Sequence, residues 1–366
     1  MQPIKFIDVG LQYAALREEI LEKIDEISGR GEYILGGELE RFEKNWAGYC
    51  GTRFAIGVAN GSDALMLALL GLGIGPGDEV ISAPNSFVAT AWAIERTGAR
   101  VVFCDVGADM NLDPALIATK ITPRTRAIMP VHLTGRIADM DPINALAEKH
   151  GLIVIEDAAP AAGATYKGRK AGSMSRAAGF SLHPTKNLHV AGDGGIITTN
   201  DPELDATLRI YRNHGLRNRD ECAFWGINSR LDCIHAGIAN LKLKYLDGWN
   251  ARFRKIAQYY TDTLQGLVTT PVLQDHEKPT FHRYMLQHPE RDRLQAFLTE
   301  HGVDTRVNYP IPLHLQPAAK DLGHKPGDFP ETERLAATIL SLPLYAELTD
   351  AHVEYVAGRV RAFFGR

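Results

Sequence analysis

The feature that most constrains the fold is an alternation of short apolar runs with helical stretches through the first two-thirds of this 366-residue chain. Each run is four or five residues long and rich in β-forming side chains, so each is predicted to be a strand. The runs are 54–58, 80–83, 101–105, 127–131, 153–156, 179–182 and 196–199. Seven strands separated by helices indicate an α/β architecture with a largely parallel sheet.

The junctions between these runs carry helix signals. A helical stretch at 146–150 ends at Gly151, a common C-terminal cap, and the next strand follows at once. A second helical run, 62–72, opens directly after Asn60 and Gly61. Its first backbone amides have no partner within the helix, so we expect them to point back at the strand ends.

The pattern changes near residue 241, where a long, charged amphipathic helix is expected over 241–260. We interpret it as the connection to a second domain. This gives a large domain over 1–249 and a smaller α+β domain over 250–366. The elements expected in the smaller domain are helices over 291–298 and 331–339 and a strand over 305–307.

The bulk composition excludes several classes of protein. Hydrophobic content of 45%, charged content of 23% and a net charge of -4 are ordinary for a soluble globular protein, and no basic patch indicates nucleic-acid binding. The longest nearly apolar run, 64–75, is too short to span a membrane, and the start has no pattern of a secretion signal, so we expect a cytoplasmic protein. The four cysteines lie far apart without a C-x-x-C pair, so neither a metal site nor a disulfide framework is expected.

The sequence Asn60-Gly61-Ser62-Asp63 could hold an anion at the start of a helix. Glycine lets the backbone approach a ligand, the amides and the Ser62 hydroxyl donate hydrogen bonds, and the helix dipole favours negative charge. Serine and aspartate are also ordinary helix caps, so a purely structural interpretation stays open.

Asp157 follows the apolar strand 153–156, at the edge where open α/β sheets bind ligands. A carboxylate in such a place needs a cationic or hydrogen-bonding partner to offset desolvation. A protonated pyridine nitrogen would be one such partner. The alternative is that Asp157 caps the alanine-rich segment that follows.

Lys186 lies after an apolar strand, between Thr185 and Asn187. A partly desolvated lysine amine is nucleophilic enough to react with an aldehyde. By itself it would more simply be a surface lysine. Together with the anion cradle and Asp157, however, it matches the aldehyde, phosphate and ring nitrogen of pyridoxal 5'-phosphate.

Several ordered motifs resemble those of the DegT/StrS family of sugar aminotransferases. They are GSDAL (61–65), PNSF (84–87), EDAA (156–159), SLHPTKN (181–187), GINSRLD (226–232), YPIPLH (309–314) and SLP (341–343). The resemblance covers essentially the whole chain. It implies a fold-type I pyridoxal-phosphate enzyme that works as a homodimer with active sites at the subunit interface.

The resemblance also implies roles for individual residues. Lys186 would carry the cofactor covalently and act as the catalytic residue, and Asp157 would pair with the pyridine nitrogen. The other implied contacts are Gly61, Ser62, Asp63 and Ser181 at the phosphate, Phe87 and Ala159 on the two ring faces, Asn228 and Arg230 in a segment that crosses from the neighbouring subunit, and Tyr309 and His314 at the substrate. Phe87 could instead be a core residue, and His183 and His314 could be structural histidines.

Four positions depart from the family pattern. Family members often have glutamine at the position of Pro160, histidine at Ala162, tyrosine at Thr134 and histidine at Asn308. These changes leave the cofactor chemistry intact but leave the substrate class open.

The expected activity is therefore transfer of an amino group from an amino acid, glutamate being the expected donor, to a nucleotide-linked keto-sugar. An unlinked keto-sugar or inosose is the alternative acceptor. Relatives that act as dehydratases replace the lysine with histidine, so Lys186 argues against that branch. A non-catalytic sensor would be expected to lose Lys186 or Asp157, and both are present.

Overall fold

A seven-stranded sheet forms the centre of the molecule in the computed structural model, which describes residues 3–365. The strands are β1 (Phe54–Val58), β2 (Glu79–Ser82), β3 (Arg100–Phe103), β4 (Thr125–Met129), β5 (Ile153–Asp157), β8 (Ala177–Ser181) and β9 (Gly195–Thr199). Their order is β1-β9-β8-β5-β4-β2-β3, and β9 alone runs antiparallel to its neighbours. The predicted α/β architecture with a mostly parallel sheet of seven strands is confirmed.

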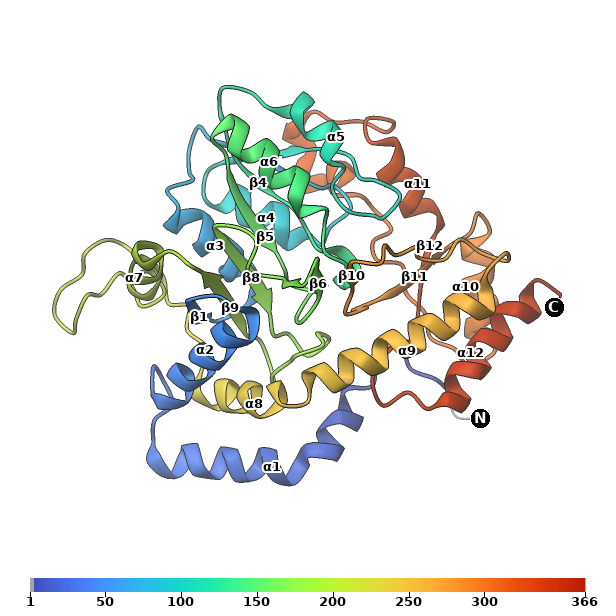
Figure 1. Cartoon of the computed structure of the whole chain (residues 1–366), viewed down its shortest axis with the longest axis horizontal. Coiled ribbons are helices and arrows are strands. Elements are labelled where there is room, and N and C mark those ends of the chain that lie inside the picture. Colours follow the sequence, from blue (N-terminus) through green and yellow to red (C-terminus); the bar gives the residue numbers. More distant parts are fainter. Residues whose placement is uncertain (1–2, 366) are drawn as a thin grey trace.

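Helices cover both faces of this sheet (Figure 1). On one face, α3 (Gly61–Gly71), α4 (Val88–Arg96) and α7 (Pro202–Tyr211) share an apolar cluster with β5 through Ile155. On the other face, α2 (Gly37–Cys50), α6 (Met140–His150) and α8 (Cys233–Leu243) contribute to a second apolar cluster that includes Val154 of β5. Successive residues of a strand point to opposite faces, so a strand that is buried on both faces is apolar along its length. This explains the continuous apolar runs in the sequence.

Three further parts surround this sheet. Helix α1 (Val9–Arg30) packs on α8, and α5 (Pro114–Ile117) is a short helix. A small sheet consists of β6 (Thr165–Tyr166), β7 (Arg169–Lys170) and β10 (Glu277–Lys278).

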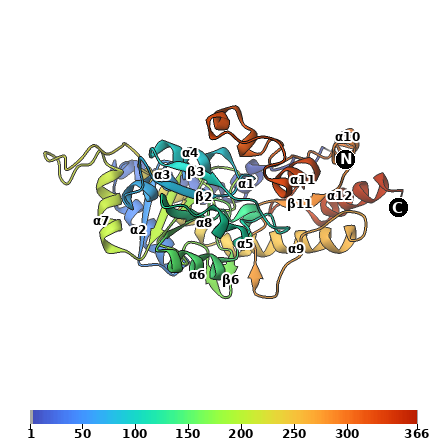
Figure 2. The same ribbon diagram turned by 90° about the horizontal axis from the view of Figure 1, so that it is seen from above.

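A second group of elements lies beyond α8. It comprises α9 (Leu246–Leu264), β11 (Tyr284–Gln287), α10 (Arg291–Glu300), α11 (Pro330–Thr338), β12 (Ile339–Leu342) and α12 (Asp350–Phe363). A separate apolar cluster holds these elements together except α11, whose Leu335 belongs to a cluster of the large sheet. Ile4 joins the separate cluster and pairs with Val303. Figure 2 shows the two groups along the long axis of the molecule, with α7 toward one end and α12 toward the other. The division at residues 249 and 250 stays a prediction.

Two expected elements differ from the structure. The helix expected over 241–260 is broken at Lys244 and Tyr245, between α8 and α9. At this break, the Tyr245 hydroxyl donates to Glu19 of α1 at 2.9 Å. The strand expected over 305–307 is only a bridge between Arg306 and Ser341. Within residues 3–365, no helix combines the length and apolar character needed to cross a membrane.

Candidate active site

A cavity of about 760 Å³ opens at the carboxyl ends of β4, β5 and β8. It is the edge of the sheet where parallel α/β folds bind ligands. The predicted site residues that line it are Gly61, Ser62, Asp63, Phe87, Asp157, Ala159, Ser181, Lys186 and Tyr309. The fold therefore brings together side chains that are up to 248 residues apart in the sequence, from Gly61 to Tyr309.

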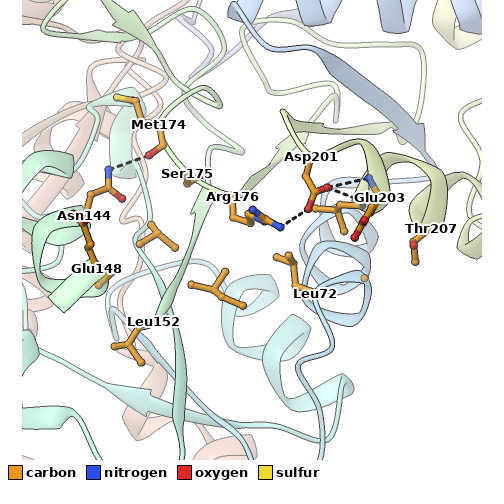
Figure 3. A pocket seen from close by; sticks show the side chains of 15 residues that line it. Leu72, Asn144, Glu148, Leu152, Met174, Ser175, Arg176, Asp201, Glu203 and Thr207 are labelled. Carbon is orange, nitrogen blue, oxygen red and sulfur yellow. Dashed lines mark hydrogen bonds and ion pairs between the residues drawn. The ribbon is translucent and has the colours of Figure 1, made fainter. Parts of the chain in front are cut away.

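A second hollow of comparable size, about 780 Å³, lies near the opposite edge of the sheet and is more open to solvent (Figure 3). Arg176 and Asp201 form an ion pair there at 2.6 Å, and Asn144 donates to the carbonyl of Met174 at 2.9 Å. These polar groups are bonded to protein partners rather than aimed at the open space. The first cavity is therefore the better candidate for chemistry.

One end of the cavity is built from the start of α3. The Asn60 side chain caps the helix by accepting from the amide of Asp63 at 2.8 Å. A Cβ atom added to Gly61 would lie 2.7 Å from the Cβ of Ser181, so only glycine permits this close approach. The approach places Ser62 and Ser181 beside the helix N-terminus, a favourable environment for an anion such as phosphate.

The Asp63 carboxylate accepts a hydrogen bond from the Ser229 hydroxyl at 2.6 Å. The Ser229 hydroxyl oxygen in turn accepts from the amide of Ala59 at 3.1 Å. Asp63 therefore anchors the 226–232 segment to the start of α3.

Asp157 ends β5, and its buried carboxylate has two hydrogen-bond donors within residues 3–365. The Thr90 hydroxyl donates at 2.7 Å and the amide of Ala159 at 3.2 Å. Burial raises the pKa of Asp157 above its ordinary value, although the Thr90 hydrogen bond opposes the shift. A buried carboxylate short of donors is stabilised by a cation, and Asp157 lines the cavity where one could bind.

Lys186 is partly buried and also lines the cavity. Burial lowers the pKa of its amine to about 8, with a further contribution from the charge of Arg283. No carboxylate lies within 4.0 Å of its amine in the part of the chain that the structure describes. A fraction of the lysine is therefore neutral and nucleophilic near neutral pH.

The loop that carries Lys186 is fixed by its neighbours. The amide of Lys186 donates to the carbonyl of His183 at 2.8 Å. The buried Asn187 side chain donates to Asn250 at 2.8 Å and to the carbonyl of Thr280 at 3.1 Å. These contacts hold the lysine in place at the edge of the sheet.

Two aromatic residues lie at the cavity wall. The ring centroids of Phe87 and Tyr309 are 5.7 Å apart. Phe87 is 53% exposed in the single chain, so the alternative that it is a core residue is wrong. An exposed ring at this position is free to stack on a planar ligand.

Three predicted residues lie outside the cavity of the single chain. Asn228 pairs with Asn213 in a segment that follows α7 and projects from the body in Figure 1. Arg230 donates to the Asn213 side chain at 3.1 Å. His314 is buried, lies 3.0 Å from Glu333 and packs on Phe329.

The cavity also contains residues that carried no signal in the sequence, notably His282 and Arg283. They belong to no motif and precede a strand, β11, that was not predicted. Of the four departures from the family pattern, Thr134, Pro160 and Asn308 line the cavity.

The sequence matches the model of the DegT/DnrJ/EryC1/StrS aminotransferase family over residues 14–361. It is 44% identical over 366 residues to a pleiotropic regulatory protein of Geobacillus stearothermophilus, with 99% of this chain and 98% of the relative covered. It is 43% identical to the dTDP-3-amino-3,4,6-trideoxy-alpha-D-glucose transaminase of Streptomyces venezuelae, with 99% and 97% covered. The crystal structure of DesV from S. venezuelae in complex with a ketimine intermediate superimposes with a TM-score of 0.98 at 42% identity, covering 100% of both chains.

Proposed function

The chain belongs to the DegT/DnrJ/EryC1/StrS aminotransferase family, and we propose that it moves an amino group from an amino acid to a nucleotide-linked keto-sugar. The observation that carries the proposal is the placement of Lys186 and Asp157 in one cavity with the start of α3. An amine, a carboxylate and an anion cradle are the groups that pyridoxal 5'-phosphate requires.

The cavity fits this cofactor. Gly61, Ser62 and Ser181 would hold the phosphate, Phe87 and Ala159 would flank the ring, and the under-bonded Asp157 would receive the protonated ring nitrogen. When bound, pyridoxal phosphate supplies an electron sink and carries the amino group between the two substrates.

Lys186 performs the proton transfers in this proposal. Its amine would accept the proton from the α-carbon of the amino acid and deliver it to the cofactor, which would keep the amino group, while water would supply the oxygen of the departing 2-oxo acid. At the keto-sugar, the same amine would move a proton from the cofactor to the sugar carbon, and the sugar oxygen would leave as water. The lowered pKa suits an amine that must both accept and release a proton near neutral pH. Asp157 stays ionised when a cationic partner offsets its desolvation.

The acceptor class is supported by the named activity of the Streptomyces relative, whose substrate is linked to a nucleotide. An unlinked keto-sugar or inosose is the second candidate, since Thr134, Pro160 and Asn308 change the cavity wall from the family pattern. The name of the Geobacillus relative describes regulation, but Lys186 and Asp157 both line the cavity of this chain, which favours catalysis.

A homodimer is part of the proposal. Phe87, Val88 and Trp92 are exposed at the cavity, and Trp225 on the projecting segment is 92% exposed. Exposed apolar side chains of this size are typical of protein interfaces. In a dimer, Asn228 and Arg230 of one subunit would complete the cavity of the other.

The purified protein should be yellow and should lose this colour when L-glutamate is added. Lys186→Ala should reduce transamination by about 10³-fold or more, because it removes the acid and base. Lys167→Ala is the matched control, since Lys167 is exposed and paired with Asp141 at 2.7 Å. Product analysis with dTDP-linked, UDP-linked and free keto-sugars then identifies the acceptor class. Wild-type transamination by Lys186→Ala, or a colourless protein that binds no cofactor, would refute the proposal.

A further inference from the structure

Arg283 is a cation in the active-site cavity, and it has no anionic partner among the residues that the structure describes. It directly precedes β11, and its amide donates to the carbonyl of Thr134 at 3.4 Å. Its side chain lines the cavity together with Lys186 and Tyr309. It thus comes from a different part of the fold than the α3 and β8 residues of the anion cradle.

The guanidinium makes few contacts. One nitrogen donates to the carbonyl of His282 at 2.8 Å, and the ring of Phe6 covers one side at 5.1 Å. No Asp or Glu oxygen lies within 4.0 Å of Arg283 in residues 3–365. Burial lowers the pKa of Arg283 to about 10, while nearby Tyr309 opposes the shift.

Two other arginines that are withdrawn from solvent are paired, whereas Arg359 lies over the Tyr355 ring with a buried Nε that has no partner in residues 3–365. Arg212 is bonded to Glu43 and to the carbonyl of Gly57 at 2.7 Å. Arg291 is paired with Asp292 at 2.6 Å and donates to the carbonyl of Ile339 at 2.7 Å. An unpaired buried charge lowers the stability of a protein. A buried arginine that stays unpaired in a cavity therefore indicates that a ligand brings the anion.

The planar fork of a guanidinium matches a carboxylate or a phosphate group. The cofactor phosphate already has its cradle at α3, and the ring nitrogen has Asp157. The anions left without a protein partner are the carboxylate of the amino donor and the diphosphate of the nucleotide-linked sugar. The carboxylate is bonded to the reacting α-carbon, whereas the sugar ring separates the diphosphate from the reacting carbon, so a cation that lines the cavity with Lys186 suits the carboxylate. We therefore propose that Arg283 binds the α-carboxylate of the amino donor and of its 2-oxo acid product, an inference that rests on the proposed function.

This assignment also connects binding to proton transfer. The positive charge of Arg283 contributes to the low pKa of Lys186, after burial. A bound carboxylate neutralises that charge, so Lys186 becomes a stronger base once the donor is in place. The lysine then gains proton affinity at the stage when it must remove the α-proton.

The reaction has two halves, one with the amino donor and one with the keto-sugar, so the effect of a variant on each substrate can be measured separately. Arg283→Met should lower kcat/KM for L-glutamate by about 10- to 100-fold in single-turnover bleaching of the yellow enzyme, because a charged hydrogen bond is lost. Arg283→Lys should fall between Arg283→Met and wild type. The return reaction with the keto-sugar should change by less than about threefold. Arg306→Met is the matched control, since Arg306 lies 5.9 Å from the same Phe6 ring but pairs with Asp304.

Binding provides a readout that does not depend on turnover. Calorimetric titration of the yellow enzyme with 2-oxoglutarate should give a Kd at least about tenfold weaker in Arg283→Met than in wild type, with Arg306→Met unchanged. Equal Kd values in Arg283→Met and wild type would overturn the proposal. Loss confined to the keto-sugar reaction would also overturn it and assign Arg283 to an anionic group of the acceptor, such as its diphosphate. A wild-type enzyme that no amino acid bleaches would instead refute the proposed function itself.

Discussion

The two faces of β5 carry neighbouring acids in opposite situations. Glu156 faces the core and receives hydrogen bonds from the amides of Gly172 at 2.7 Å and Met174 at 2.9 Å, and from the Ser175 hydroxyl at 2.8 Å. His132 adds a further contact at 2.9 Å. Asp157 faces the cavity and has two donors. A carboxylate with all its partners stabilises the fold, whereas one with too few is available for a ligand.

The pKa values of the two acids express this difference. Burial alone would raise the pKa of Glu156, but the His132 hydrogen bond and the amide of Gly172 hold it below its usual value. The Nδ1 atom of His132 accepts from the amide of Ala138 at 3.2 Å, so its Nε2 carries the proton and donates to Glu156. For Asp157, burial prevails and the pKa is raised. Glu156 therefore favours folding at neutral pH, while Asp157 opposes it until a cation binds.

Asp157→Asn tests the cavity side and should have the largest effect on activity among the variants that compare the two acids. We expect transamination to fall by about 10²- to 10³-fold, since the cationic ring nitrogen loses a buried partner worth about 3–5 kcal/mol. The melting temperature of the cofactor-free protein should equal or exceed that of wild type, because a poorly compensated charge is gone. Activity and thermal unfolding are measured on the same preparation. If the cofactor-free protein instead lost much of its stability, Asp157 would stabilise the fold as Glu156 does.

Glu156→Gln tests the core side and should act on stability instead. The free energy of unfolding at neutral pH should fall by about 2–4 kcal/mol, because several buried donors lose a charged acceptor. The folded protein should keep its activity within about threefold. Because the pKa of Glu156 is lowered on folding, its stabilisation is present above the ordinary value of 4.5 and is lost as the pH falls through the folded value. Denaturant titrations across that range should show the two proteins converging in acid.

Thr90→Val gives the smallest expected effect and sharpens the comparison. It removes one of the two hydrogen bonds to Asp157 and leaves the Ser86 hydroxyl, 2.7 Å from that of Thr90, without its partner. Activity should fall by about tenfold, corresponding to about 1.5 kcal/mol. Thr90→Ser, which keeps the hydroxyl, is the control. If both variants matched wild type, the Asp157 environment would be insensitive to its donors.

The sequence predicted the parts of this molecule whose cause is local. Apolar runs and helix caps located the seven strands, and the carboxyl ends of those strands located Asp157 and Lys186. The break at Lys244 and Tyr245 was not predicted, because the apolar spacing of a helix continues across it. Arg283 was missed for another reason: its importance lies in the absence of a partner, and only the folded chain shows which carboxylates are out of reach.

The contact between Gly61 and Ser181 has a consequence for engineering this enzyme. Position 61 has no room for even a methyl group. In a library randomised at this position, every other residue would therefore force α3 away from Ser181. Thr134 and Asn308 line the same cavity without belonging to the cradle. Redesign for a new acceptor should therefore vary Thr134 and Asn308 and keep Gly61 unchanged, because Gly61 sets the distance between α3 and Ser181.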